Sequence, residues 1–577
     1  MFKLIKTSLR EYKKAAILSP AFVTLEVIIE IIIPLLTAEL IDNGVEAGNM
    51  SVILRTGGWL VLLCLMSLLT GVLCGVFSAK AGAGFASNLR HDLYYAVQDF
   101  SFENIDKFST SSIVTRLTTD ITNIQMAFIT LIRMGVRCAV MLLFSLIMVL
   151  RINARLGLIF LGILPVLGAG LYLIVTNAHP VFMRVFNAYD RLNRVVQENL
   201  LSIRIVKSFV REDYECKKFG KVSDDIYRDF SKAERLVACN MPLMQTCVYA
   251  CLILISWIGA KLIVGGEMTT GLLTSVITYA MQVLMSLLML SVVFVMLTIS
   301  RASVARANEL LEERTTLSSP EAPVYEVRNG SISFKNVDFR YGGEKNNLCL
   351  SGVNLDIRSG ETIGILGGTG SSKSTLVQLI PRLYDAVNGT VEVGGIDVRE
   401  YDLTSLRNSV SMVLQKNELF SGTISDNLRW GNPDATDEEL VHACRLAQAD
   451  DFIRSFPDGY DTHIEQGGTN VSGGQKQRLC IARALLKKPK ILILDDSTSA
   501  VDTATDALIR QAFRDELPDT TKIIIAQRAA SVEDADRIIV MDGGRVSAVG
   551  THDELMASSD IYREVYISQT KGGADDE

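Results

Sequence analysis

Six long apolar stretches occupy most of the first 300 residues, and they constrain the fold more than any other feature. A helix needs about 20 apolar residues to cross a bilayer, because each residue adds about 1.5 Å. The chain is therefore predicted to begin as an α-helical domain with six transmembrane spans. We expect the third helix to start before Met134, with Arg133 and Arg137 at its cytoplasmic or cavity-facing end. The stretches lie roughly at 16–40, 57–79, 134–150, 156–178, 243–265 and 272–299.

The connections between these stretches alternate in length. Those after spans one, three and five are short, whereas those after spans two and four are long and charged. Because Lys and Arg concentrate in cytoplasmic loops, the N-terminus, the long loops and the C-terminal domain are predicted to be cytoplasmic. The second long loop contains ENLLSIRIVKSFVREDYE, in which we expect a short helix that docks into a groove on the soluble domain. The basic N-terminal segment lacks a small-residue cleavage site, which favours a retained segment over a signal peptide.

Two carboxylates lie inside the first span. Glu26 and Glu30 are one helical turn apart and so share a face. Ionisable groups inside a bilayer are costly and tend to face cavities or partners. Two interpretations remain open: the polar wall of a substrate cavity that favours cations, or internal pairing with a basic group such as Arg133 or Arg137.

Composition excludes some classes of protein. The formal net charge of −7 over 577 residues argues against a partner nucleic acid, which normally selects a basic surface. The ten cysteines are scattered without a CxxC pair, which argues against a disulfide framework or a zinc site. Roughly the last 250 residues have the pattern of a soluble α/β domain. The charged and Pro/Ser-rich segment 301–327 marks the boundary between the two halves.

A phosphate-binding loop is predicted in ETIGILGGTGSSKSTLVQLI, where an apolar strand, a Gly-rich turn and a helix follow one another. Backbone N–H groups of such a loop cradle phosphates, while Lys373 can reach the β- and γ-phosphates and Ser374 can bind Mg²⁺. Ser372 replaces the glycine of the usual GxxxxGK[ST] pattern, and we expect nucleotide binding to survive. The predicted ATP-binding loop comprises Gly367, Gly368, Thr369, Gly370, Ser371, Ser372, Lys373, Ser374 and Thr375.

Further motifs follow in a fixed order. SMVLQ places Gln415 at a strand end, suited to Mg²⁺ or an attacking water. NVSGGQKQRLCIARALLKKPKILILDD joins a Ser-Gly-Gly-Gln turn, a helix, and a strand ending at Asp495 and Asp496. With SAVD and IIIAQR behind them, these motifs resemble the ATP-binding cassette family, and with six spans ahead the whole chain resembles a half-size ABC exporter. Each motif alone is weak, whereas the ordered set is specific.

The resemblance implies a fold class, domains and cofactors. The fold is expected to be an α-helical six-span transmembrane domain followed by an α/β P-loop ATP-binding cassette domain, with ATP and Mg²⁺ as cofactors. The predicted parts are a transmembrane domain at 1–305, a linker at 306–329, a nucleotide-binding domain at 330–570, and a disordered acidic tail at 571–577.

The resemblance also implies residue roles. Tyr341 matches the aromatic residue that stacks on adenine. Asp495 matches the acid that holds Mg²⁺ through water, beside Ser374 and Gln415. The segment EQGG at 465–468 is similar to one that senses the membrane-domain loops. Ser499 and Asp502 lie in the loop that links two sites. The signature that closes on ATP held by another subunit corresponds to Val471, Ser472, Gly473, Gly474 and Gln475. Because each site uses two cassettes, a chain with one cassette is expected to dimerise.

Three positions depart from the family pattern. Asp496 stands where the family has a catalytic glutamate that polarises water, and it is one methylene shorter. Gln527 replaces a histidine and cannot carry imidazolium charge. With Ser372, these changes fall on the site built on this chain's own phosphate loop, whereas VSGGQ stays close to the family's LSGGQ. The pattern is similar to the degenerate half of bacterial heterodimeric multidrug exporters, and a slowly hydrolysing homodimer is the alternative.

The predicted function is ATP-driven export of amphipathic or drug-like compounds across the cytoplasmic membrane. Glu26, Glu30 and the Met-rich sixth span are candidates for the cavity wall, although Met at such spacing also serves in packing. The alternatives are a homodimeric lipid or peptide exporter with slow hydrolysis, and an ATP-binding regulatory or channel subunit. The family's fold does not fix the cargo.

Overall fold

The computed structural model describes residues 2–342, 348–497 and 499–571. The chain forms two compact units, one of Met1–Gln98 with Ser111–Glu312 and one of Asp99–Thr110 with Glu313–Glu577. The change of unit after Glu312 falls inside the predicted linker. Lys571 ends the last helix, and the rest of the predicted acidic tail lies outside the described residues.

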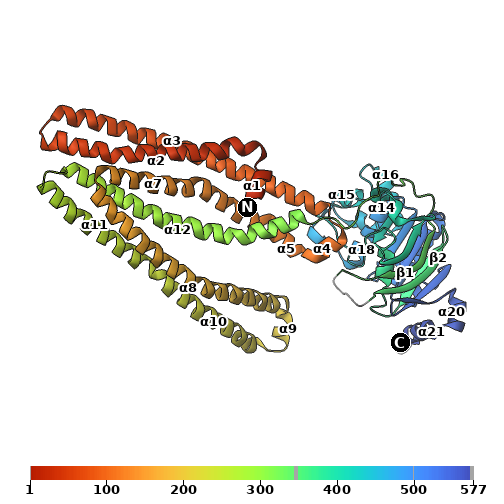
Figure 1. The fold of residues 1–577 in the computed structure, drawn as a ribbon. Helices are drawn as coiled ribbons and strands as arrows, with labels where there is room; N and C mark the ends of the chain where they lie inside the picture. The colour runs from red at the N-terminus through yellow and green to blue at the C-terminus, as the bar shows by residue number, and fades with distance from the viewer. Residues whose placement is uncertain (1, 343–347, 498, 572–577) are drawn as a thin grey trace. The chain divides into compact units, whose positions relative to one another are not determined.

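The first unit is entirely helical in its described part (Figure 1). Its α-helices are α1 (Phe2–Ser8), α2 (Lys13–Glu39), α3 (Met50–Gln98), α5 (Thr110–Thr115), α6 (Ile121–Thr130), α7 (Val136–Ile152), α8 (Ala154–Leu201), α9 (Ile203–Ser208), α10 (Glu212–Ala238), α11 (Asn240–Val264) and α12 (Thr270–Glu312). Three π-helical turns join some of them, η2 (Leu40–Glu46), η3 (Arg116–Asp120) and η4 (Leu131–Gly135), and one 3₁₀ turn, η1 (Arg10–Tyr12), precedes α2.

Six helical stretches of the described chain are long and apolar enough to cross a membrane, as predicted. The third confirms that its helix starts before Met134, since it runs from Thr110 to Ile152. The six stretches are Arg10–Glu46, Met50–Gln98, Thr110–Ile152, Ala154–Val185, Glu212–Val264 and Thr270–Glu312.

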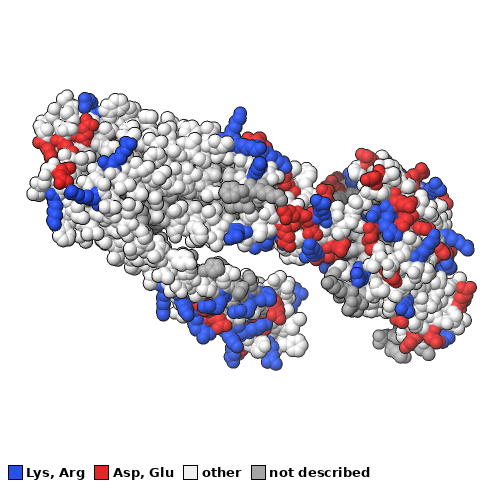
Figure 2. All heavy atoms as spheres, in the orientation of Figure 1, with Lys and Arg blue, Asp and Glu red and all other residues white. Residues whose placement is uncertain are grey.

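The helices of this unit pack as long neighbours. In Figure 1, α2 lies along α3, and α8 lies beside α10. Large apolar side chains such as Trp59, Leu65 and Leu68 point outward from α3, which suits lipid better than water. On the face in Figure 2 most of this unit carries no charge, whereas Lys and Arg gather over the α8–α10 end. The short helix α9 forms at this end, within the segment where a helix was expected.

The second unit is an α/β domain. Its strands are β1 (Ile332–Phe339), β2 (Leu350–Ile357), β3 (Thr362–Gly367), β4 (Asn388–Val393), β5 (Ile396–Asp397), β6 (Val410–Val413), β7 (Gly422–Thr423), β8 (His463–Ile464), β9 (Ile491–Asp495), β10 (Thr521–Ile525), β11 (Arg537–Asp542) and β12 (Arg545–Gly550). Its α-helices are α4 (Phe102–Phe108), α13 (Lys373–Gln378), α14 (Leu403–Ser409), α15 (Ile424–Arg429), α16 (Asp437–Leu446), α17 (Asp450–Ser455), α18 (Gly473–Leu485), α19 (Thr503–Glu516), α20 (His552–Ser558) and α21 (Asp560–Lys571). The 3₁₀ turns are η5 (Val398–Glu400), η6 (Gly459–Asp461), η7 (Gln466–Gly468) and η8 (Ala529–Ser531).

A six-stranded sheet with the order β12-β11-β3-β10-β9-β6 positions the site. The runs ILILD and TKIII are buried at every position, as expected of parallel strands covered on both faces. β10 pairs in parallel with β3 and with β9, so Ile525 lies opposite both Ile365 and Asp495. The loops that follow these three strands therefore meet at one edge, where ligands bind in such sheets. A second, antiparallel sheet has the order β2-β1-β4-β5.

The short helix α4 belongs to this second unit, although it lies between the second and third spans in sequence. Ser101 caps its N-terminus in a capping box with the buried Asn104. The Asn104 amide donates to Glu313 Oε1 at 2.9 Å and to the Arg314 carbonyl at 3.1 Å. The Ser101 and Thr316 hydroxyls are hydrogen-bonded at 2.7 Å. The start of the cassette is thus tied to α4 through well-satisfied polar groups.

Candidate functional site

The predicted phosphate loop connects β3 to α13. Gly367 ends the strand, residues 368–372 form the turn, and Lys373–Thr375 begin the helix. A Cβ on Gly367 would lie 2.3 Å from the Met541 carbonyl, so only glycine fits there. Ser372 has φ of 69°, in the left-handed region where glycine is normally preferred. The substitution of this loop glycine by serine therefore places a side chain on a strained backbone.

Lys373 folds back over the loop. Its Nζ donates to the carbonyls of Gly367 and Gly368, both at 2.8 Å, and to Ser371 Oγ at 3.3 Å. Burial lowers the pKa of Lys373, and the charges of Asp495 and Asp496 oppose that shift. Phosphate oxygens can take over these hydrogen bonds from the loop's own oxygens, so the arrangement is compatible with the predicted phosphate site.

The side chains predicted to hold Mg²⁺ come together at the tip of β9. Asp495 Oδ1 accepts from Ser374 Oγ at 2.9 Å, and the Asp495 side chain is buried. Burial and the neighbouring charge of Asp496 raise the pKa of Asp495. A hydroxyl and a carboxylate beside a phosphate cradle suit Mg²⁺, which prefers oxygen ligands and one or two carboxylates. Bound there, Mg²⁺ would neutralise charge on the transferred phosphate.

Two glutamines surround the acid at the hydrolytic position. Gln527 Nε2 donates to Asp496 Oδ2 at 2.6 Å, and the side chain of Gln415 is hydrogen-bonded to the same carboxylate. Burial raises the pKa of Asp496, and these two hydrogen bonds oppose the shift. Asp496 also has a left-handed backbone, with φ of 49°. The structure therefore brings the three predicted residues of this site together, with the carboxylate already engaged by amides.

Tyr341 sits above the helix that follows the phosphate loop. Its hydroxyl is hydrogen-bonded to Thr375 Oγ1 at 3.1 Å and donates to Gln378 Oε1 at 3.2 Å. Burial raises the pKa of Tyr341. These bonds fix the ring close to the phosphate loop, where an adenine ring could stack on it. The stacking role stays a prediction.

The predicted signature forms the start of α18. Ser472 is the N-cap, and its Oγ accepts from the Gln475 backbone N–H at 3.3 Å while Gln475 Oε1 accepts from the Ser472 N–H at 2.9 Å. Val471 precedes this capping box and Gly473 opens the helix. A Cβ on Gly474 would lie 2.8 Å from the Ala500 carbonyl. The second glycine is therefore required by the close approach of the next loop.

That next loop carries Ser499 and Asp502. Ser499 Oγ donates to the Asp496 carbonyl at 3.0 Å, and Asp502 caps α19 by accepting from the Thr505 N–H at 2.9 Å. Sequence reasoning missed the buried Gln477, which connects this loop to the signature helix. Its Oε1 accepts from the Ala500 N–H at 3.0 Å and its amide donates to Ser499 Oγ at 3.3 Å. A glutamine on the buried face of a helix was the available signal.

Within the described residues, no hydrogen bond or ion pair joins Ser472–Gln475 to the phosphate loop. The two motifs lie on different elements, α18 and α13. The 465–468 segment forms η7, where Lys476 Nζ donates to the Gly467 carbonyl at 2.6 Å. Its sensing role stays a prediction.

In the membrane unit, Arg137 lies between the two predicted carboxylates. Its guanidinium approaches Glu26 Oε1 at 2.7 Å and Glu30 Oε1 at 2.8 Å. The structure thus shows the pairing that the sequence left open, and selects Arg137. Arg137 follows the π-helical turn η4 by two residues, and such turns often re-aim functional side chains. The substrate-cavity role of Glu26 and Glu30 stays a prediction.

Comparison with known proteins identifies the family. The model of the ABC transporter transmembrane region matches residues 16–287, and that of the ABC transporter matches residues 350–499. The uncharacterized ABC transporter ATP-binding protein YfiB of Bacillus subtilis (strain 168) is 34% identical over 561 residues, which cover 97% of each chain. The chain belongs to the ABC transporter family.

Other relatives agree with this assignment. An uncharacterized ABC transporter ATP-binding protein of Mycobacterium tuberculosis (strain CDC 1551 / Oshkosh) is 32% identical over 575 residues, 99% of this chain and 98% of the relative. A multidrug efflux ATP-binding/permease protein of M. tuberculosis (strain ATCC 25618 / H37Rv) is 32% identical over 559 residues, 95% of this chain and 46% of the relative. This ABC transporter fuses one membrane domain to one ATP-binding domain, which confirms the predicted family and fold class.

Proposed function

We propose that this ABC transporter is one half of a heterodimeric exporter, and that its own nucleotide site binds Mg²⁺-ATP but hydrolyses it poorly. The observation that carries the proposal is the engagement of the Asp496 carboxylate by Gln527 and Gln415. A general base needs an oxygen within hydrogen-bond reach of the attacking water. Here the shorter aspartate directs its oxygens to two amides, neither of which can exchange a proton.

The rest of the site supports binding without efficient chemistry. The hydrogen bonds of Lys373, Ser374 and Asp495 support the binding of phosphates and Mg²⁺ at this site. A displacement of about 1 Å at the reacting group can cost on the order of a hundredfold in rate. We infer that ATP at this site stabilises the closed cassettes, and that hydrolysis occurs at the site completed by this chain's signature.

A second subunit supplies what this chain lacks. The signature residues are preorganised by the Ser472–Gln475 capping box, and they begin a different helix from the one that follows the chain's own phosphate loop. A different half-exporter with a working acid would use this signature. Hydrolysis at that shared site would then reset the transport cycle.

Amphipathic or drug-like compounds are the proposed cargo. A relative is named as a multidrug efflux protein, and the cluster of Glu26, Glu30 and Arg137 combines two carboxylates with one guanidinium. When all three are charged the cluster has one net negative charge, which favours a cationic compound. The basic end formed by α8–α10 supports a cytoplasmic position for that end and for the cassette, in the cell membrane.

Steady-state Mg²⁺-ATPase activity of the purified full-length chain in lipid tests the proposal. We expect background activity for the natural chain and at least about a tenfold increase for the Asp496→Glu/Gln527→His double variant, because the longer acid and the imidazole restore the missing chemistry. Lys373→Ala in the double variant is the control and should return the activity to background. Brisk activity in the natural chain that Asp496→Asn abolishes would instead establish a homodimer with a competent aspartate.

The cargo is tested separately. The Glu26→Gln/Glu30→Gln variant, assembled with its partner, should transport cationic dyes less well while transport of neutral dyes is retained. Equal transport across a panel of cations would contradict the cationic preference and leave the nucleotide-site proposal standing.

A further inference from the structure

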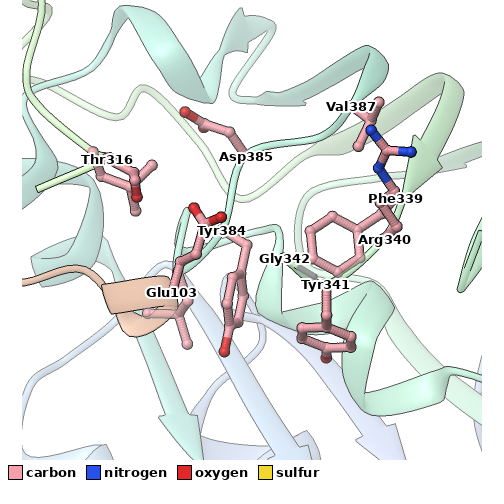
Figure 3. A pocket seen from close by; sticks show the side chains of 11 residues that line it. Glu103, Thr316, Phe339, Arg340, Tyr341, Gly342, Tyr384, Asp385 and Val387 are labelled. Carbon is pink, nitrogen blue, oxygen red and sulfur yellow. The ribbon is translucent and has the colours of Figure 1, made fainter. Parts of the chain in front are cut away.

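A cavity of about 310 Å³ adjoins Tyr341 in the second unit (Figure 3). It is lined by the end of β1, by the segment that follows α13, by the residues that follow α12, and by α4. Small-molecule sites span roughly 300–1,000 Å³, so this cavity fits a single ring system better than a whole nucleotide. It lies next to the predicted phosphate site, because the Tyr341 hydroxyl is bonded to Thr375.

Aromatic rings form one part of this cavity. Tyr341 packs edge-to-face against Tyr384, with ring centroids 5.3 Å apart, and against Phe339 at 5.0 Å. Edge-to-face packing holds each ring in one orientation. A planar ring system can therefore lie on Tyr341 without the tyrosine having to move first.

The carboxylates around the cavity differ in their partners. Among the described residues, two carboxylates line the cavity, Glu103 and Asp385, and Asp385 is paired with Arg382 at 2.8 Å. Asp106, which lies on α4 but is not among the lining residues, accepts from the Tyr384 hydroxyl at 2.7 Å. Glu103 makes no hydrogen bond or ion pair with any residue that the structure describes. Burial, the bond to Asp106 and the nearby charge of Glu103 all raise the pKa of Tyr384. Glu103 is thus the cavity carboxylate whose oxygens remain available.

The backbone places Glu103 beside Gly342, the residue after Tyr341. A Cβ on Gly342 would lie 2.7 Å from Glu103 Oε1, so the carboxylate occupies the space that a larger residue would fill. α4 itself is fixed by the Asn104 bonds to Glu313 and Arg314. Glu103 is therefore held at the cavity by a helix with little freedom to withdraw.

With the base of the nucleotide on Tyr341, as the family resemblance implies, we propose that Glu103 determines base specificity by accepting a hydrogen bond from the exocyclic amine of adenine. Tyr341 provides a stacking surface that any base can use, whereas a carboxylate accepts hydrogen bonds and donates none. A base with a hydrogen in place of the amine loses this bond. The inference rests on the proposed function only in requiring that the chain's own phosphate loop binds ATP.

Equilibrium binding to the full-length chain in lipid nanodiscs, at a temperature where hydrolysis is negligible, tests this proposal. The probes are ATP and purine riboside triphosphate, which lacks the 6-amino group and keeps the stacking ring and all three phosphates. A hydrogen bond to a charged acceptor predicts that the natural chain binds ATP about tenfold more tightly. The variants are Glu103→Ala, Glu103→Gln and the matched surface control Glu326→Ala, which removes an exposed carboxylate of the same domain.

Glu103→Ala should bring the affinity ratio close to one by weakening ATP alone. Glu103→Gln, which keeps an acceptor oxygen without the charge, should retain part of the ratio, and Glu326→Ala should retain all of it. An unchanged ratio in Glu103→Ala would overturn the inference while leaving the proposed function intact. If the natural chain bound neither triphosphate, the proposed nucleotide site would fail, and this inference with it.

Discussion

Two edges of the cassette differ in the backbone conformation and burial of their polar residues. The signature edge lies at the starts of α18 and α19, and the phosphate-loop edge follows β3 and β9. On the signature edge, Ser472 and Asp502 are helix N-caps in extended backbone, a relaxed arrangement. On the phosphate-loop edge, Ser372 and Asp496 both have positive φ, and burial raises the pKa of Asp496. Of these four residues, the two on the phosphate-loop edge have a left-handed backbone and the two on the signature edge do not. The difference supports the proposal that the signature serves a site shared with a partner, whereas the chain's own site hydrolyses ATP poorly.

The largest expected effect lies on the signature edge. Gly474→Val should lower the ATPase activity of the proposed heterodimer by about a hundredfold, because the new side chain meets the Ala500 carbonyl and displaces the signature. Asp496→Asn should change the same activity less than about threefold, which is within ordinary mutational variation. Equal losses of ATPase activity in the two variants would contradict the contrast between the edges, because both edges would then be required for hydrolysis.

The connection between the signature and the following loop comes next. Gln477→Leu removes hydrogen bonds to Ser499 and Ala500 and should lower the heterodimer's ATPase activity about tenfold. Gln511→Leu on the exposed face of α19 is the matched control and should have no effect. If both variants retained full activity, Gln477 would serve packing alone.

Backbone strain in the phosphate loop gives a smaller effect. Ser372→Gly should relieve a left-handed conformation that costs about 1 kcal/mol for a residue with a Cβ. ATP should then bind a few times more tightly to the chain alone, as measured by titration in the absence of hydrolysis. A weaker affinity would show that the serine hydroxyl contributes to phosphate binding and that the position is adapted rather than strained.

The smallest expected effect is a difference between the two edges in how the unfolding temperature depends on pH. Burial raises the pKa of Asp496 above its ordinary value of 3.8, so a charged Asp496 lowers the free energy of unfolding at neutral pH. This destabilisation disappears as the pH falls below 3.8 and the carboxylate is protonated in both the folded and the unfolded chain. Asp496→Asn should therefore unfold at a higher temperature than the natural chain at pH 7, and the gap should close on acidification.

Asp502 should behave in the opposite way. A hydrogen bond from the Thr505 N–H lowers its pKa, so its contribution is present above 3.8 and is lost as the pH falls through the lowered value. Asp502→Asn should unfold at a slightly lower temperature at pH 7 and match the natural chain in acid. Thermal unfolding from pH 8 down to about pH 2 measures both variants, and shifts of the same sign at pH 7 would contradict the comparison.

Much of the architecture could be predicted because it depends on local pattern. The apolar runs predicted the six spans, and the buried strand ILILD predicted that Asp495 would reach the sheet edge. The pairing of Arg137 with Glu26 could not be selected over Arg133, because two helices far apart in sequence decide it. The positive φ of Asp496 likewise accompanies a hydrogen bond from its N–H to the Ile525 carbonyl on a neighbouring strand, a contact between distant segments.

Two further features escaped prediction for the same reason. α4 follows a membrane-spanning helix in sequence. The residues that flank Asn104 in the sequence do not indicate that its side chain contacts Glu313. The buried amide of Gln477 acts through the backbone of Ala500, which belongs to another element. Packing decides which distant segments are in contact. Residue spacing and composition predict only the local structure of a single segment.

The attachment of α4 has a practical consequence for dissecting the protein. A gene fragment cut at Glu313 would encode every strand of the cassette and none of α4. Tyr384 would lose its bond to Asp106, and Thr316 its bond to Ser101. Such a fragment would keep the phosphate loop yet lack one wall beside Tyr341. Nucleotide preferences measured on it would describe a truncated site, so a faithful minimal cassette has to carry residues 99–110 as a second, separately joined piece.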